Sequence, residues 1–339
     1  MRPESTDFQR SFLQRLQATF SSRGELVASL GDTLQVGRDA IYRRLRGDTA
    51  LTANELMLLS RHYRIPLESD THRSDVPVMY YHSGAAPIES DEAYYKQLRR
   101  HTANLVQLPN VRVDYATPQL PIFYEMATPV LAAFKTYVYG TTTWDLPKWR
   151  NIPFRPELIS PTTRQLIDSV LADAQRIPGR ELWSIGILDV TLRQVSYMVQ
   201  VGRFAERKHV ELIFEELHQV INHLERMVRT GKRFPLGGEP KDDDPDFAVY
   251  HNELSNTNNA IIVRSDISNL LFNTLVNPNY VMSADPRILR DVEQWFNRLV
   301  KNSNTLNNQT GKYTSQYFGR LRQQVDATRE RVAFANVIF

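Results

Sequence analysis

Four arginines crowd one short stretch of the chain. Arg38, Arg43, Arg44 and Arg46 lie within nine residues. A guanidinium group stays charged at physiological pH and can bond a phosphate oxygen or the edge of a guanine, so this density is typical of a surface that contacts nucleic acid. The plainer alternative is a solvated helix face. The helices predicted around the arginines indicate which of these two explanations is favoured.

The net positive charge of the chain comes from its first fifth. Residues 1–67 hold ten arginines and no lysine against seven acidic residues, which gives +3, and the whole chain also carries +3. The remainder therefore sums to zero. A net charge of this size says little by itself. Its distribution places any nucleic-acid contact in the N-terminal region.

The arginines fall in the second half of an expected helix-turn-helix unit. Apolar spacing predicts a helix over 26–35, and Gly37 can N-cap the next helix, which Gly47 can end. Two helices that cross steeply need a small residue at the crossing, and Gly31 provides it. Gln35 occupies the tight turn, where a left-handed backbone is usual. The apolar positions that join the two helices are Leu30, Leu34, Val36, Ile41 and Leu45.

One further helix on each side completes the expected domain. Residues 7–20 have the apolar spacing of an amphipathic helix. Thr52 and Glu55 form a capping-box pattern ahead of a fourth helix, which Pro66 ends. We therefore expect a four-helix DNA-binding domain over residues 1–68. A solvated face would not require this framework, so the framework favours DNA binding.

Residues 26–69 resemble the lambda-repressor-like helix-turn-helix domain of bacterial transcription regulators. The likeness is closest to a subgroup whose recognition helix has the pattern Asp-x-x-Tyr-Arg-Arg-x-Arg-Gly, matched here by Asp39, Tyr42, Arg43, Arg44, Arg46 and Gly47. The commoner pattern has an apolar residue in place of Arg44 and Glu in place of Leu45. Segments such as ELWSIGILDVTLRQVSYM and YHNELSNTNN extend the resemblance into the large region, for which it implies no activity and no ligand.

The resemblance implies which side chains meet DNA. In the lambda-like arrangement, the first turns of the recognition helix face the major groove. The residues placed there are Arg38, Asp39, Tyr42 and Arg43. Arg38 and Arg43 are expected to read guanine, and Asp39 to accept from cytosine or to orient an arginine. Arg44 and Arg46, nearer the helix end, are expected to contact phosphates.

The expected fold class is mainly α with a small α+β component. After a linker at 69–75, residues 76–339 are expected to form a larger, helix-dominated domain for dimerisation and possible sensing. Its expected helices are 91–108, 122–139, 162–177, 180–201, 210–228, 286–300 and 317–325. Its expected strands are 76–81, 111–115 and a pair at 247–254 and 260–263, while 267–275 fits a third strand or a helix.

The large region offers little catalytic chemistry. The absence of cysteine excludes disulfides, thiolate zinc sites and thiol catalysis. His209, His218 and His223 lack the spacing of a zinc-binding helix, and the acidic run 242–246 lacks the alternation of a calcium loop. We therefore expect no enzyme, no catalytic residues, no metal and no cofactor.

The most ligand-like feature of the large region is a polar cluster that follows residue 249. Its candidate ligand-binding residues are Tyr250, Asn252 and Glu253. The neighbouring asparagines are common in hairpin turns, and this structural explanation is the stronger one. Trp144, Trp149 and Trp183 could line a pocket, although core packing is the stronger expectation for them too.

These observations predict a sequence-specific, DNA-binding transcription regulator. One small domain offers little contact area, so we expect a homodimer on palindromic double-stranded DNA. Alternatives are a ligand-binding or enzymatic C-terminal module that the N-terminal domain localises, and a four-helix domain that binds protein. The chain shows no signal peptide and no apolar run of membrane-spanning length, so we expect a cytoplasmic protein without membrane contact. The sequence identifies no small-molecule effector.

Overall fold

Contacts along the chain separate it into two units, Met1–Val78 and Met79–Phe339, here called the N-terminal unit and the C-terminal unit. In this computed structural model the structure describes residues 5–63, 65, 67, 81–82, 88–253, 259–307 and 310–335. The predicted linker at 69–75 lies outside the described residues.

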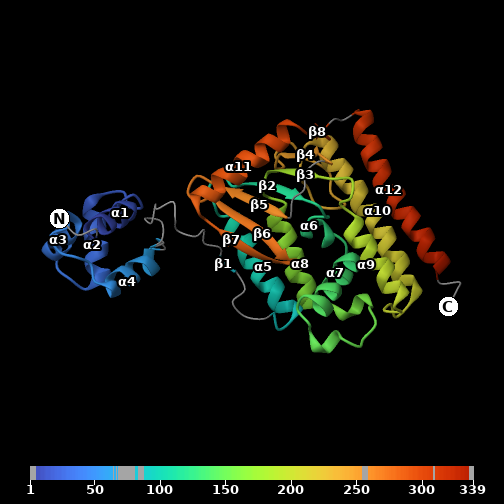
Figure 1. The fold of residues 1–339 in the computed structure, drawn as a ribbon, viewed down its shortest axis with the longest axis horizontal. Helices are drawn as coiled ribbons and strands as arrows, with labels where there is room; N and C mark the ends of the chain where they lie inside the picture. The colour runs from blue at the N-terminus through green and yellow to red at the C-terminus, as the bar shows by residue number, and fades with distance from the viewer. Residues whose placement is uncertain are drawn as a thin grey trace. The chain divides into compact units, whose positions relative to one another are not determined.

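The N-terminal unit contains four helices where the sequence predicts them (Figure 1). They are α1 (Ser5–Gln17), α2 (Arg23–Leu34), α3 (Arg38–Arg46) and α4 (Ala53–Tyr63). Side chains from all four meet in one core. Phe12, Leu26, Ile41 and Leu59 are each at most 1% exposed, so every helix contributes a fully buried anchor. Burial of such side chains is the main stabilising term for so small a unit.

A mixed sheet forms the centre of the C-terminal unit (Figure 1). Its strands are β1 (Tyr81–His82), β2 (Arg112–Thr117), β3 (Gly179–Trp183), β4 (Phe247–His251), β5 (Ala260–Arg264), β6 (Leu270–Val276), β7 (Asn279–Ser283) and β8 (Asn304–Thr305). Among the described residues their order is β1-β7-β6-β5-β2-β3-β4-β8. The central strands β2, β3 and β4 are parallel, and the other pairings are antiparallel.

Helices cover both faces of this sheet. They are α5 (Asp91–Leu105), α6 (Ile122–Glu125), α7 (Pro129–Thr142), α8 (Pro161–Ala174), α9 (Asp189–Gln200), α10 (Arg207–Thr230), α11 (Pro286–Lys301) and α12 (Lys312–Ala335), with 3-10 turns η2 (Pro147–Trp149) and η3 (Pro156–Leu158). Leu182 of β3 packs in one core with Phe296 of α11. The next residue, Trp183, points to the opposite face and joins the larger core built with α7, α10 and α12. Alternation along one strand therefore separates the two cores.

The predicted fold class, mainly α with a small α+β component, is wrong, because the C-terminal unit is a substantial α/β fold. The predicted helix 180–201 shows the reason. Its first residues form β3, and only Asp189–Gln200 is helical. Leu182, Ile185 and Leu188 repeat every three residues and so continue the apolar spacing of α9. A five-residue strand flanked by strands on both sides shows no clear alternation of apolar and polar residues, so its sequence does not distinguish it from a helix.

The predicted pairing of strands 247–254 and 260–263 is wrong. Strands β4 and β5 both exist, but β3 and β2 lie between them in the sheet. The chain that joins them is a crossover and not a hairpin turn. Of the predicted strand 76–81, only residue 81 is described, in β1. The predicted helix 122–139 is two helices, since Pro129 starts α7 after α6 has ended.

Candidate nucleic-acid interface

The turn between α2 and α3 has the geometry that the motif requires. Gln35 adopts the left-handed conformation, with φ 54° and ψ 43°. Its N–H and that of Val36 both donate to the carbonyl oxygen of Gly31. A Cβ atom on Gly31 would lie only 3.2 Å from the Val36 carbonyl oxygen. A side chain at this position would therefore require the turn to shift slightly away from α2, and Gln35 bears the backbone strain.

One face of α3 is fixed in the core of the N-terminal unit. Ile41 is 1% exposed. Leu34, Val36 and Leu45, the other apolar positions of the motif, are partly buried and pack against the same core. Gly37 begins α3, and Gly47 ends it with a positive φ of 83°. These contacts fix which side of the short helix is turned outward.

The outward face carries most of the candidate DNA-contacting residues. The exposed side chains are those of Arg38, Asp39, Tyr42, Arg43 and Arg46. Arg38 and Arg43 form no ion pair with another residue that the structure describes. Arg46 forms an exposed pair with Asp48, at 2.8 Å between Nε and Oδ2. An exposed ion pair of this kind exchanges easily for a phosphate because its net stabilisation is small.

Arg23 adds a cation that the sequence analysis missed. It lies in the first turn of α2, and its guanidinium carbon is 5.9 Å from the centroid of the Tyr42 ring. Tyr42 is itself 37% exposed. The ring therefore joins the start of α2 to the exposed face of α3. Nothing in the local sequence around Arg23 indicates this, because the contact spans the whole helix-turn-helix unit.

Arg44 is turned away from the other arginines. Its Nη2 atom lies 2.7 Å from Oε1 of Glu55 in α4, its Nη1 donates to the Ala40 carbonyl oxygen, and the side chain is 15% exposed. This geometry removes Arg44 from the predicted phosphate-contacting set. It also accounts for the exchanged Arg44 and Leu45 positions, since Leu45 takes the apolar contact while Arg44 ties α3 to α4.

Glu55 has two tasks. Its Oε2 accepts from the Thr52 backbone N–H at 2.7 Å, and the Thr52 hydroxyl accepts from the Glu55 N–H at 3.2 Å, which is the predicted capping box. Its Oε1 accepts from Arg44. Partial burial alone would raise the pKa of Glu55, but the hydrogen bonds from Thr52 and Arg44 outweigh it and the pKa is lowered.

Gln9 connects α1 to the recognition helix and was also missed. Its Nε2 donates to the carbonyl oxygens of Arg44 and Thr49, each at 2.9 Å, and its Oε1 accepts from the Leu51 N–H at 2.7 Å. The side chain is 7% exposed. One buried amide thus satisfies three backbone groups where α3 ends, which fixes that end against α1.

The candidate ligand-binding residues of the polar cluster each contact another part of the C-terminal unit. Tyr250 packs against the core that contains α11. Asn252 donates to the Ser303 hydroxyl at 3.0 Å, and Glu253 accepts from the Ile185 N–H at 2.6 Å and contacts His251. The three side chains have separate structural partners. Asn259, a further asparagine of the cluster, is buried, and its Oδ1 accepts from the Thr117 hydroxyl at 2.7 Å. The asparagines at 256 and 258 lie outside the described residues.

Other side chains weighed from the sequence have structural positions. Trp144, Trp149 and Trp183 are buried in the larger core. No group of three or more His, Asp or Glu residues in the described part of the chain is arranged to hold a metal ion. Within the same residues, no helix has both the length and the apolar character to cross a membrane.

Comparisons with family models, with curated proteins and with solved structures gave no match to this chain.

Proposed function

We propose that the protein is a sequence-specific, DNA-binding transcription regulator. The observation that carries the proposal is the asymmetry of α3. Ile41 fixes one face in the core, while Arg38 and Arg43 on the other are exposed and form no ion pair with a described residue. Such arginines are available to guanine edges and phosphates without first breaking an internal contact.

We propose a division of roles within this surface. Arg38 and Arg43 are the proposed base-reading residues, and Asp39 and Tyr42 lie beside them on the exposed face. Arg23 and Arg46 flank the surface and are proposed to contact phosphates. Arg44, paired with Glu55, acts as a positioning residue that holds α3 against α4.

We further propose that the protein acts in the cytoplasm as a homodimer on a palindromic operator. The reason is energetic. A single helix-turn-helix domain buries little surface, and two half-sites about 34–36 Å apart allow a symmetric dimer to double the contacts. Light scattering during size-exclusion chromatography gives the mass of the free protein, and footprinting gives the half-site spacing. A monomer on an unrepeated site would contradict the homodimer.

The test of base reading needs the operator first. Selection from random double-stranded oligonucleotides yields it, and fluorescence anisotropy then gives affinities for the operator and for a scrambled duplex. Removal of two bidentate arginine contacts costs about 1–3 kcal/mol each. At about 1 kcal/mol for each contact, Arg38→Ala/Arg43→Ala would reduce operator affinity by about 30-fold. A larger cost for each contact would reduce it further. Arg61→Ala, which removes an exposed arginine of α4, is the matched control.

Two outcomes would contradict the proposal. One is equal operator affinity of the double variant and the Arg61→Ala control. The other is binding with little salt dependence, since displacement of counterions makes affinity for DNA fall steeply with salt while a hydrophobic protein interface does not. The second result would favour a protein partner for the four helices.

A further inference from the structure

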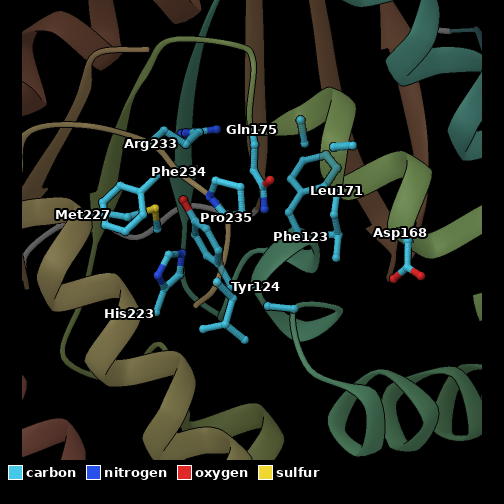
Figure 2. Close-up of a pocket in the computed structure, with 14 residues that line it drawn as sticks. Phe123, Tyr124, Asp168, Leu171, Gln175, His223, Met227, Arg233, Phe234 and Pro235 are labelled. Atoms are coloured by element: carbon cyan, nitrogen blue, oxygen red, sulfur yellow. The ribbon is translucent and has the colours of Figure 1, made fainter. Parts of the chain in front are cut away.

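A cleft of about 340 Å³ opens in the C-terminal unit between α6, α8, α10 and the segment after α10 (Figure 2). Its walls are mainly apolar. They include Phe123, Leu171, Met227, Phe234 and Pro235. The volume lies within the range of small-molecule sites, which are largely apolar with a few polar groups. All of these residues belong to one unit, so the cleft does not depend on the placement of the N-terminal unit.

Gln175 supplies the available side-chain amide of this cleft, whose lining also holds His223 Nδ1 and Arg233 Nε, both buried without a hydrogen-bond partner among the described residues. Gln175 follows the last turn of α8, and its amide points into the cleft between Phe123 and Pro235 (Figure 2). The amide forms no hydrogen bond with another side chain or backbone group that the structure describes. It therefore offers both a donor and an acceptor. The Tyr124 hydroxyl already donates to Oε1 of Glu181 at 2.7 Å.

The charged and titratable groups around the cleft leave no free positive charge for an anion. Arg233 is paired with Glu181 at 2.9 Å, and both side chains are buried. Burial lowers the pKa of His223 to about 4, so its imidazole is neutral at physiological pH. Asp168, at the rim, is exposed and negative. A carboxylate or phosphate ligand would therefore meet repulsion without a compensating cation.

We propose that this cleft is a small-molecule site for an uncharged, ring-sized apolar compound that carries a hydrogen-bonding group. The apolar walls bury the ring, and Gln175 bonds the polar group. Occupation of the cleft would link α8 and α10 across one bound molecule. The site stands apart from the proposed DNA-binding role and can be tested without DNA.

The test uses three probes of similar size on the full chain. They are 2-naphthol, which is neutral and can hydrogen-bond, 2-methylnaphthalene, which cannot, and 2-naphthoate, which is an anion. Methyl-labelled methionine provides the readout by NMR, because Met227 lines the cleft while Met57 and Met198 lie elsewhere. The Met227 signal is assigned with Met227→Leu.

We expect 2-naphthol to shift the Met227 signal saturably and to leave those of Met57 and Met198 in place. Its affinity should exceed that of 2-methylnaphthalene by about threefold to tenfold, which corresponds to one hydrogen bond. The anion should bind weakest. An unshifted Met227 signal with both neutral probes, or tightest binding of 2-naphthoate, would overturn the proposal.

A pair of variants tests the role of Gln175. Gln175→Leu should remove the preference for 2-naphthol while it retains binding of 2-methylnaphthalene. Gln165→Leu, which alters an exposed residue of the same helix outside the cleft, should retain the preference. Equal behaviour of the two variants would show that Gln175 does not bond the ligand and would contradict the proposed site chemistry.

Discussion

Arg43 of α3 and Arg233, which follows α10, carry the same guanidinium group in opposite surroundings. Arg43 is exposed and forms no ion pair with a described residue. Arg233 is 9% exposed, lies 2.9 Å from Glu181, and stacks 4.6 Å from the centroid of the Phe247 ring. The first is ready for an external partner, while the second is already paired with a carboxylate inside the fold. Arginine content alone therefore does not locate a binding surface.

The same contrast extends to the carboxylates. Glu55 in the N-terminal unit is partly exposed, and hydrogen bonds lower its pKa. Glu181 is fully buried in the C-terminal unit, and its pKa is raised because desolvation outweighs the Arg233 charge and three hydrogen bonds. Glu55 thus ties helices together near the surface of the N-terminal unit, whereas Glu181 is held inside the core of the C-terminal unit. Three experiments can break or sharpen this contrast.

The largest effect is expected from the buried pair of Lys135 and Glu125, whose charged atoms lie 2.8 Å apart with both side chains 1% exposed. Lys135→Met leaves the buried carboxyl group of Glu125 without its cationic partner, while the Tyr139 hydroxyl still donates to it. Removal of one member of such a pair costs about 3–5 kcal/mol of unfolding free energy. Urea denaturation followed by tryptophan fluorescence measures it, because all four tryptophans belong to the C-terminal unit.

Two further variants make this result interpretable. Lys208→Met breaks an exposed pair with Glu206 and should cost far less. Lys135→Met/Glu125→Gln removes both charges and should recover much of the loss, even if the single variant does not fold. If Lys135→Met and Lys208→Met were equally stable, the buried pair would not contribute as its geometry indicates.

A smaller effect is expected in the N-terminal unit from Gln9→Leu. The substitution leaves the Leu51 N–H and the carbonyl oxygens of Arg44 and Thr49 without their buried partner, at a cost of about 2 kcal/mol. Hydrogen exchange read by mass spectrometry should show faster exchange in peptides from α3 and the following loop. Gln14→Leu, at an exposed position of the same helix, is the control and should leave this exchange unchanged.

The sequence predicted the N-terminal unit well because its signals are local. Gly31, Gly47 and the capping box of Thr52 and Glu55 each act within a few residues of the element they define. What it could not predict are the contacts between distant residues. Gln9 bonds backbone groups 35 to 42 residues away, and Arg44 pairs with a residue of the next helix. No local pattern distinguishes these from exposed polar residues.

The C-terminal unit was predicted less well because its strands are short and enclosed. β3 continues the apolar spacing of α9, so periodicity assigned it to a helix. β4 and β5 were recognised as strands, yet β5 pairs with β2, more than 120 residues earlier in the chain, and β4 pairs with β3, more than 60 residues earlier. The cleft beside Gln175 could not be predicted from the sequence, because its walls come from three helices and a loop that are distant along the chain.

The smallest and most specific effect concerns Glu55 and pH. Because the folded-state pKa of Glu55 is lowered, its ionised form stabilises the N-terminal unit above the unfolded-state pKa near 4.5, and this contribution is lost as pH falls through the lower folded-state value. The side chain is near the surface, so the contribution is at most about 1 kcal/mol. The stability difference between wild type and Glu55→Gln should therefore be present at pH 7 and shrink below pH 4.5.

Hydrogen exchange in peptides from α3 and α4, corrected for the intrinsic rate at each pH, measures this difference. Asp32→Asn removes an exposed carboxylate from α2 and serves as the control, for which we expect a small difference at every pH. A difference for Glu55→Gln that stays constant from pH 7 to pH 3 would mean that the Arg44 contact does not depend on the charge of Glu55. The tie between α3 and α4 would then not need a charged carboxylate, and the contrast between the two units would reduce to burial alone.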